Sequence, residues 1–84
     1  MNESNYFVYI LYSKTSDVYY RGITQNIEKR FSEHNENKSR YTSSKGPWVL
    51  VYTKSYLSKK EALIEERRLK KLNRDSLISL ISKL

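Results

Sequence analysis

The sequence has 84 residues, a formal net charge of +7 and no cysteine. This length predicts one domain over residues 1–84, because two smaller parts could not each bury a core. The lack of cysteine excludes a disulfide framework and a thiolate metal site. No apolar run approaches the roughly 20 residues of a membrane span, and the N-terminus has no signal-peptide pattern. We therefore expect a cytoplasmic protein without membrane contact. Its excess positive charge favours nucleic acid as partner over an unpartnered basic surface.

Two strands are predicted at residues 6–12 and 17–23, which are rich in tyrosine, valine and isoleucine. The polar stretch between them is typical of a hairpin loop. Alternation along the first strand places Phe7, Tyr9 and Leu11 on one face, and Val8, Ile10 and Tyr12 on the other. Both faces are apolar, which indicates a central strand covered on both sides.

A helix is predicted over residues 27–35, with Thr24 or Asn26 as its cap. Ile27 and Phe31 lie one turn apart on it, so we expect them to anchor the helix to the sheet. The following residues, to Gly46, are polar and basic and indicate a loop, and the sequence Gly46-Pro47 ends it.

The C-terminal half predicts a third strand at residues 48–52 and two helices. A capping box formed by Ser58 and Glu61 opens the first helix, which runs to about Leu72. Residues 73–76 indicate a break, and the last helix begins at Leu77. The order is β-β-α-β-α-α, which predicts an α+β fold with a small three-stranded antiparallel sheet flanked by helices.

Two adjacent glutamates fall close to the apolar face of the helix after Ser58. Glu66 lies inside that face and Glu65 lies at its other side, so the helical phase does not choose between them. A carboxylate near a core is costly unless it is paired or binds a cation. One carboxylate with open water positions suits Mg²⁺. The alternative is a salt bridge to a nearby arginine or lysine, which the periodicity alone favours.

Four side chains in the first half could act on a phosphate ester. The planar fork of Arg30 can hold two phosphate oxygens, and His34, one turn further, could act as a base or contact a phosphate. Tyr9 and Tyr20 could accept a proton if a cation activated them. Each also has an ordinary interpretation: a solvated arginine, a surface histidine, or tyrosines packed in the core.

The loop before the third strand interleaves an aromatic residue with positive charges, since Tyr41 lies among Lys38, Arg40 and Lys45. This mixture suits the backbone of a nucleic acid.

The order of these motifs resembles that of the GIY-YIG nuclease family. Phe7-Val8-Tyr9 stands where the family has Gly-Ile-Tyr, and Tyr20-Arg21-Gly22 stands where it has Tyr-Ile-Gly. Three further segments resemble the family's later motifs: Gly22 to His34, Arg40 to Tyr52, and Ala62 to Leu72. The resemblance covers roughly residues 6 to 82 and implies a minimal nuclease domain.

By this resemblance, Tyr9 and Tyr20 are catalytic tyrosines, Arg30 stabilises the phosphate, and Glu66 rather than Glu65 binds a single Mg²⁺ or Mn²⁺. It also implies that His34 and Tyr41 belong to the site. The second motif departs from the family at Arg21, which adds a cation near the site. The residues expected to contact nucleic acid are Arg21, Lys38, Arg40 and Lys45.

Three functions remain open from the sequence. The first is a metal-dependent endonuclease that acts on DNA, with a protein partner supplying the specificity that larger family members obtain from separate DNA-binding domains. The second is a non-catalytic nucleic-acid binding module. The third is a protein-interaction domain that uses the amphipathic segment from Leu77 to Leu84.

Overall fold

The computed structural model describes residues 5–36 and 42–83. Its elements are β1 (Tyr6–Ser13), β2 (Val18–Thr24), α1 (Ile27–Asn35), β3 (Trp48–Tyr56), α2 (Lys59–Lys71) and α3 (Arg74–Ser82). The three strands form one antiparallel sheet in the order β2-β1-β3. The predicted fold class and element order are confirmed, and β1 is the central strand as expected.

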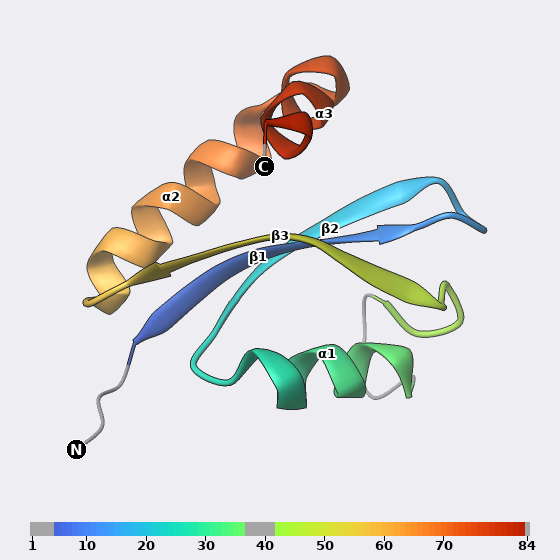
Figure 1. Cartoon of the computed structure of the whole chain (residues 1–84), viewed down its shortest axis with the longest axis horizontal. Helices are drawn as coiled ribbons and strands as arrows, with labels where there is room; N and C mark the ends of the chain where they lie inside the picture. Colours follow the sequence, from blue (N-terminus) through green and yellow to red (C-terminus); the bar gives the residue numbers. More distant parts are fainter. Residues whose placement is uncertain (1–4, 37–41, 84) are drawn as a thin grey trace.

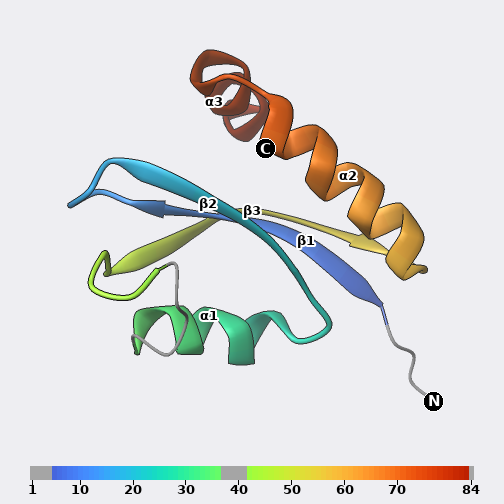
Figure 2. The ribbon, with the colours of Figure 1, turned by 180° about the vertical axis from the view of Figure 1, so that it is seen from behind.

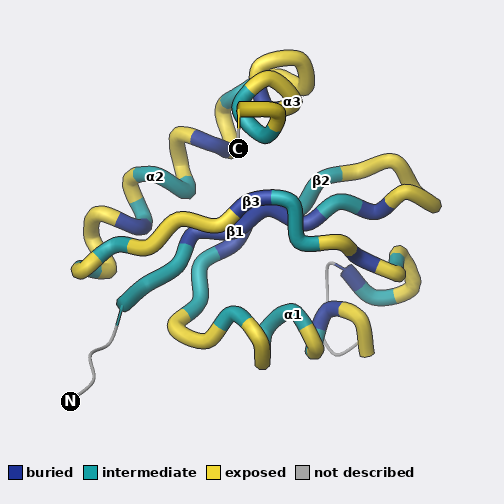
Figure 3. Tube along the Cα trace, viewed as in Figure 1, coloured by how far each residue is buried: buried dark blue, intermediate teal, exposed yellow. Residues whose placement is uncertain are grey.

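The helices cover the two faces of the sheet unequally. Helix α1 lies against one face, and α2 and α3 lie against the other (Figure 1). The view from behind shows the same three layers (Figure 2). Burial follows this arrangement, because the middle of β1 is buried while the hairpin tip at residues 14–18 is exposed (Figure 3). In the part of the chain that the structure describes, every helix is too short or too polar to cross a membrane.

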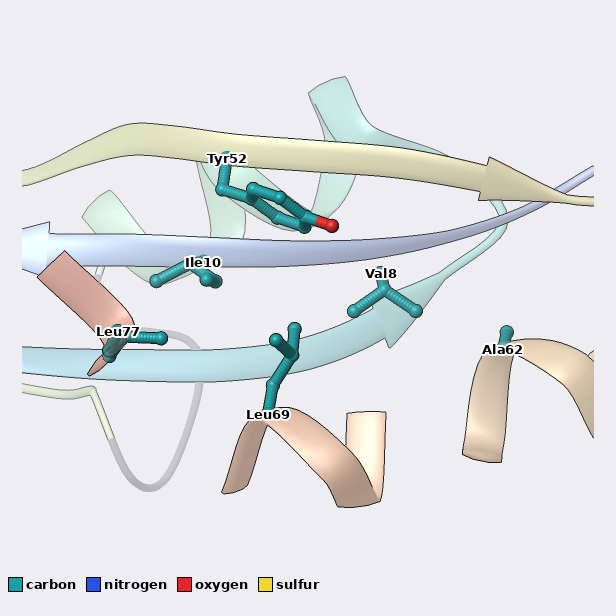
Figure 4. Close-up of a cluster of buried hydrophobic side chains, with 6 residues drawn as sticks. All are labelled: Val8, Ile10, Tyr52, Ala62, Leu69 and Leu77. Carbon is teal, nitrogen blue, oxygen red and sulfur yellow. The ribbon is translucent and has the colours of Figure 1, made fainter. Parts of the chain in front are cut away.

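The face under α2 and α3 carries an apolar core. Its buried members are Val8, Ile10, Tyr52, Ala62, Leu69 and Leu77, which come from β1, β3 and both helices (Figure 4). Full burial of an aliphatic side chain contributes about 1.5–3 kcal/mol. Burial of this cluster therefore supplies much of the free energy that holds α2 and α3 on the sheet.

The face under α1 carries a second, smaller cluster formed by Tyr9, Leu11 and Trp48. Ile27 and Phe31 of α1 pack against it, as predicted. The predicted alternation along β1 is thus confirmed, with Tyr9 and Leu11 on the face of α1 and Val8 and Ile10 on the face of α2.

Local capping explains where the helices begin. Of the two candidates for α1, Asn26 is the cap, because its side chain accepts a hydrogen bond from the amide of Lys29 at 3.0 Å. Ser58 caps α2 as predicted and accepts from the amide of Glu61 at 3.2 Å. The Glu61 carboxylate accepts a hydrogen bond from the Ser58 hydroxyl.

Two predicted boundaries are wrong. Strand β3 continues four residues past residue 52 to Tyr56, because Tyr56 pairs with Tyr6 at the start of β1. Helix α3 begins at Arg74 rather than Leu77, since the Asn73 side chain accepts from the amide of Ser76 at 2.8 Å. The polar residues predicted as a break therefore form a cap and a first helical turn.

Candidate functional site

Tyr9 lies at the centre of the site because the strand beside it carries a glycine. The Cα of Tyr9 pairs with that of Gly22 across β1 and β2. A Cβ atom at Gly22 would lie 2.5 Å from the Tyr9 phenol oxygen, which is shorter than any real carbon contact of this kind. The missing side chain therefore leaves the room that the Tyr9 ring occupies.

A buried chain of hydrogen bonds holds the phenol of Tyr9. Its oxygen lies 2.9 Å from Nε2 of His34, and Nδ1 of His34 lies 2.6 Å from Oγ1 of Thr42. His34 and Thr42 are both fully buried. The Thr42 carbonyl in turn accepts a hydrogen bond from the indole of Trp48 at 3.2 Å. The imidazole is thus fixed at both nitrogens and lies behind the tyrosine, away from the surface.

The imidazole of His34 is neutral at physiological pH. Burial lowers the pKa of His34 from 6.5 to about 4, and the nearby charge of Arg30 lowers it further in the same direction. A neutral imidazole has one donor and one acceptor nitrogen. Two tautomers of His34 therefore fit this chain of hydrogen bonds. In one the Tyr9 phenol donates to Nε2, and in the other it accepts from Nε2.

The phenol of Tyr9 is held in its protonated form. Burial raises the pKa of Tyr9 to about 12, and the nearby Tyr20 and the carboxylate of Glu66 act in the same direction. Hydrogen bonding with Arg30 and its positive charge oppose this rise in the pKa. A further positive charge beside Tyr9 would lower its pKa, which is how a cation could activate it.

Tyr20 and Arg30 complete the surface around Tyr9. The ring of Tyr20 in β2 lies 4.9 Å from that of His34 and 6.2 Å from that of Tyr9, centroid to centroid. Arg30 projects from α1 and forms an ion pair with Glu33 at 2.9 Å. Hydrogen bonds with Glu33 and Tyr9 raise the pKa of Arg30. The structure therefore brings together the four residues that the sequence predicted from the first two strands and α1.

The two glutamates of α2 have different surroundings. Both oxygens of Glu65 accept from Arg68, at 2.8 and 2.6 Å, and this hydrogen bonding lowers the pKa of Glu65. Glu66 has a looser ion pair, with Oε2 3.4 Å from Nζ of Lys70. Of the two glutamates, Glu66 is the one whose charge raises the pKa of Tyr9. Glu66 is therefore near enough for its charge to act on the ionisation of Tyr9, while Glu65 is held by Arg68.

The donor set at Glu66 fits a hard cation that keeps several waters. Its side chain is 16% exposed, and among the described residues its ion-pair partner is Lys70, at 3.4 Å. Mg²⁺ is commonly bound through one or two carboxylates with water in its other positions. The described residues contain no group of three histidine, cysteine, aspartate or glutamate side chains that could form a closed metal cage.

An open pocket follows the outer edge of β2. Arg21, Lys45 and Lys70 line it beside Tyr20 and Trp48. The Nε atom of Arg21 is buried without a hydrogen-bond partner in the structure. Two of the predicted nucleic-acid contacts, Arg21 and Lys45, thus reach one surface.

Some site residues fall outside these predictions or outside the structure. Lys38, Arg40 and Tyr41 lie outside the described residues, so their placement is untested. Sequence reasoning missed Thr42 and Lys70. Lys70 follows Glu66 by four residues, a spacing that favours a helical ion pair and could have revealed it.

Comparison with known proteins gives consistent similarities. The description "GIY-YIG catalytic domain" belongs to the family that matches residues 5–78. The chain is 39% identical over 82 residues to a UPF0213 protein of Oceanobacillus iheyensis, covering 96% of this chain and 93% of the relative. It is 42% identical over 77 residues to a UPF0213 protein of Clostridium perfringens, with coverage of 90% and 82%.

A solved structure extends the similarity to the fold. The solution NMR structure of a UPF0213 protein from Bacillus halodurans matches with a TM-score of 0.61 and 37% sequence identity. The match covers 93% of this chain and 83% of that one. All the site residues described above lie within the matched family region.

Proposed function

The chain belongs to the GIY-YIG family, and from this we propose that it is a metal-dependent endonuclease that hydrolyses phosphodiester bonds in DNA. The observation that carries the proposal is the arrangement around Tyr9, whose phenol is held by His34 at 2.9 Å and lies within reach of the charges of Arg30 and Glu66. A net charge of +7 suits a polyanionic substrate. The proposed unit is one nuclease domain over residues 1–84, located in the cytoplasm.

The proposed chemistry divides the work among these side chains. Arg30 binds the oxygens of the scissile phosphate and stabilises the charge that builds on them. The Tyr9 oxygen accepts a hydrogen bond from the attacking water and orients it, while Tyr20 holds the water from the other side. His34 fixes the Tyr9 hydroxyl, and which of the two tyrosines acts as the base stays open.

Glu66 is the proposed ligand of one Mg²⁺ or Mn²⁺. When bound, the ion supplies positive charge that stabilises the leaving 3′ oxygen and offsets the carboxylate charge that raises the Tyr9 pKa. Arg21 of β2 and Lys45 before β3 are proposed contacts to the rest of the nucleic acid. Lys38, Arg40 and Tyr41 are further proposed contacts from their place in the sequence.

The test is cleavage of labelled single-stranded and branched DNA with Mg²⁺, Mn²⁺ or EDTA. We expect metal-dependent nicking by the parent protein that is lost in Glu66→Ala. Glu65→Ala is the matched control, since Glu65 is the adjacent glutamate held by Arg68, and it should still cleave. Cleavage by Glu66→Ala at the parental rate would refute the metal assignment.

The second candidate is a non-catalytic nucleic-acid binding module. The protonated state of Tyr9, whose pKa is raised to about 12, favours it, because a neutral phenol is a poor base. Such a module would bind DNA with an affinity that falls steeply with salt and ignores EDTA. Binding without cleavage in every metal condition would support this alternative.

A further inference from the structure

Lys70 forms an ion pair that is well suited to exchange. Its Nζ lies 3.4 Å from one oxygen of Glu66, and the lysine side chain is 56% exposed while that of the glutamate is 16% exposed. The neighbouring Glu65 is held differently, by two hydrogen bonds of 2.8 and 2.6 Å from one guanidinium. A single long contact from an exposed lysine is a weak interaction. The ammonium can therefore leave Glu66 at little cost.

The pocket along β2 offers Lys70 a second position. Lys70 lines this pocket with Arg21 of β2 and Lys45 of the loop before β3, so that three positive side chains from separate elements converge there. Arg21 adds a buried Nε donor for which the described residues supply no acceptor. Converging cations and an unused guanidinium donor suit the oxygens of a phosphodiester, which accept hydrogen bonds from such groups.

The pocket adjoins the catalytic aromatic residues. Tyr20 lines it, and its ring lies 4.9 Å from that of His34. An anion held there would be a close neighbour of a phosphate bound by Arg30. In a nucleic acid, a second phosphate of the same backbone could supply such an anion.

We propose that Lys70 exchanges between two anions: it pairs with Glu66 in the free protein and with a backbone phosphate in the β2-edge pocket when nucleic acid is bound. The inference rests on the proposed function, because it takes Glu66 as the metal ligand. In the free protein Lys70 competes with the divalent ion for Glu66. Nucleic acid draws Lys70 away, so metal and nucleic acid each favour binding of the other.

The first arm of the test measures Mn²⁺ binding by calorimetry without DNA. Lys70→Gln should bind Mn²⁺ roughly threefold to tenfold tighter than the parent protein, because a competing cation next to the carboxylate is gone. Lys71→Gln is the matched control, with the same charge change at an exposed neighbour. Glu66→Gln should abolish the binding. Equal shifts in the two lysine variants, or Mn²⁺ binding that does not depend on Glu66, would overturn the exchange.

The second arm measures binding of a fluorescent oligonucleotide in EDTA, where no cleavage occurs. Here Lys70→Gln should bind roughly threefold to tenfold weaker than the parent, and clearly weaker than Lys71→Gln. Parental affinity in Lys70→Gln would overturn the phosphate half of the proposal. Inorganic phosphate binding with the same dependence on Lys70 would also overturn it, in favour of a free-anion site. If neither the parent nor any variant binds the oligonucleotide, the proposed function fails. The Mn²⁺ arm decides separately whether Lys70 competes with the ion for the Glu66 carboxylate.

Discussion

The two faces of the sheet are built from alternate residues of the same strand but serve different ends. Toward α2 and α3, β1 presents Val8 and Ile10 to an apolar core. Toward α1 it presents Tyr9, whose hydroxyl meets the buried polar side chains of His34 and Thr42. A polar cluster can be buried only when its hydrogen bonds are satisfied. The larger apolar core therefore lies on the first face, while the tyrosine and histidine of the site lie on the second, and α2 adds Glu66 from the first.

The largest effect on the apolar face should come from Leu69→Ala. Leu69 is fully buried between α2 and the sheet, so truncation should lower the free energy of unfolding by about 2–5 kcal/mol. Urea unfolding measures this change. Leu57→Ala is the control, because Leu57 is 84% exposed and should change stability little. The folded fraction of Leu69→Ala should keep the DNA cleavage rate of the parent, and a loss of that rate would break the division between the faces.

The converse effect is expected on the face of α1. Arg30→Ala should reduce DNA cleavage roughly 10²- to 10³-fold, as for the loss of one preorganised donor to transition-state charge. Its stability should fall less than that of Leu69→Ala, because its ion pair with Glu33 is partly exposed and such pairs contribute about 0–1 kcal/mol. Single-turnover cleavage in Mg²⁺ measures the loss of cleavage rate, and thermal unfolding measures the change in stability. Lys29→Ala, the exposed neighbour, should match the parent in cleavage, whereas an equal loss there would assign the effect to general charge.

The buried histidine makes the α1 face sensitive to acid. Burial lowers the pKa of His34 from 6.5 to about 4, so below pH 6.5 the unfolded chain binds a proton that the folded protein does not. The stabilisation is complete above about pH 6.5 and is lost as the pH falls toward about 4, by roughly 3 kcal/mol in all. Urea unfolding between about pH 7 and pH 5 measures the slope, which should largely disappear in His34→Gln.

The carboxylates of Asp17 and Glu65 contribute little to the pH dependence of stability in this range. The pKa values of Asp17 and Glu65 are lowered from 3.8 and 4.5 by hydrogen bonds from Arg74 and Arg68. Their stabilisation is lost mainly at lower pH than that of His34. An identical slope in the parent and in His34→Gln above about pH 5 would contradict a neutral buried histidine.

Gly22→Ala tests whether the glycine sets the position of the phenol. The added Cβ would lie 2.5 Å from the Tyr9 oxygen, so the ring must shift, at a cost of about 1–3 kcal/mol in stability. DNA cleavage should fall as well, because the phenol leaves His34. Gly46→Ala is the control, since the nearest atom to its added Cβ is 3.5 Å away. Cleavage by Gly22→Ala at the rate of Gly46→Ala would show that the site tolerates the displacement.

The sequence predicted the faces of the sheet better than the partners within the site. Alternation along β1 separates Val8 from Tyr9 without any tertiary information. Helical phase left Glu65 and Glu66 open, because both fall near the apolar stripe. Only the surrounding side chains distinguish them, with Glu65 paired to Arg68. His34 and Thr42 are eight positions apart in the sequence, with no periodic pattern between them that could predict their contact.

The smallest effect concerns the boundary that the sequence misplaced. Asn73 satisfies the amide of Ser76 at the start of α3, and removing such a cap costs about 1 kcal/mol. Asn73→Ala should therefore lower the free energy of unfolding by about that amount and leave cleavage unchanged, because α3 packs on the apolar face through Leu77. Asn73→Ser keeps an acceptor and should recover most of the loss. If Asn73→Ala cleaved DNA more slowly than the parent while Asn73→Ser did not, the apolar face would be supporting the chemistry of the other one, and the comparison of two independent faces would fail.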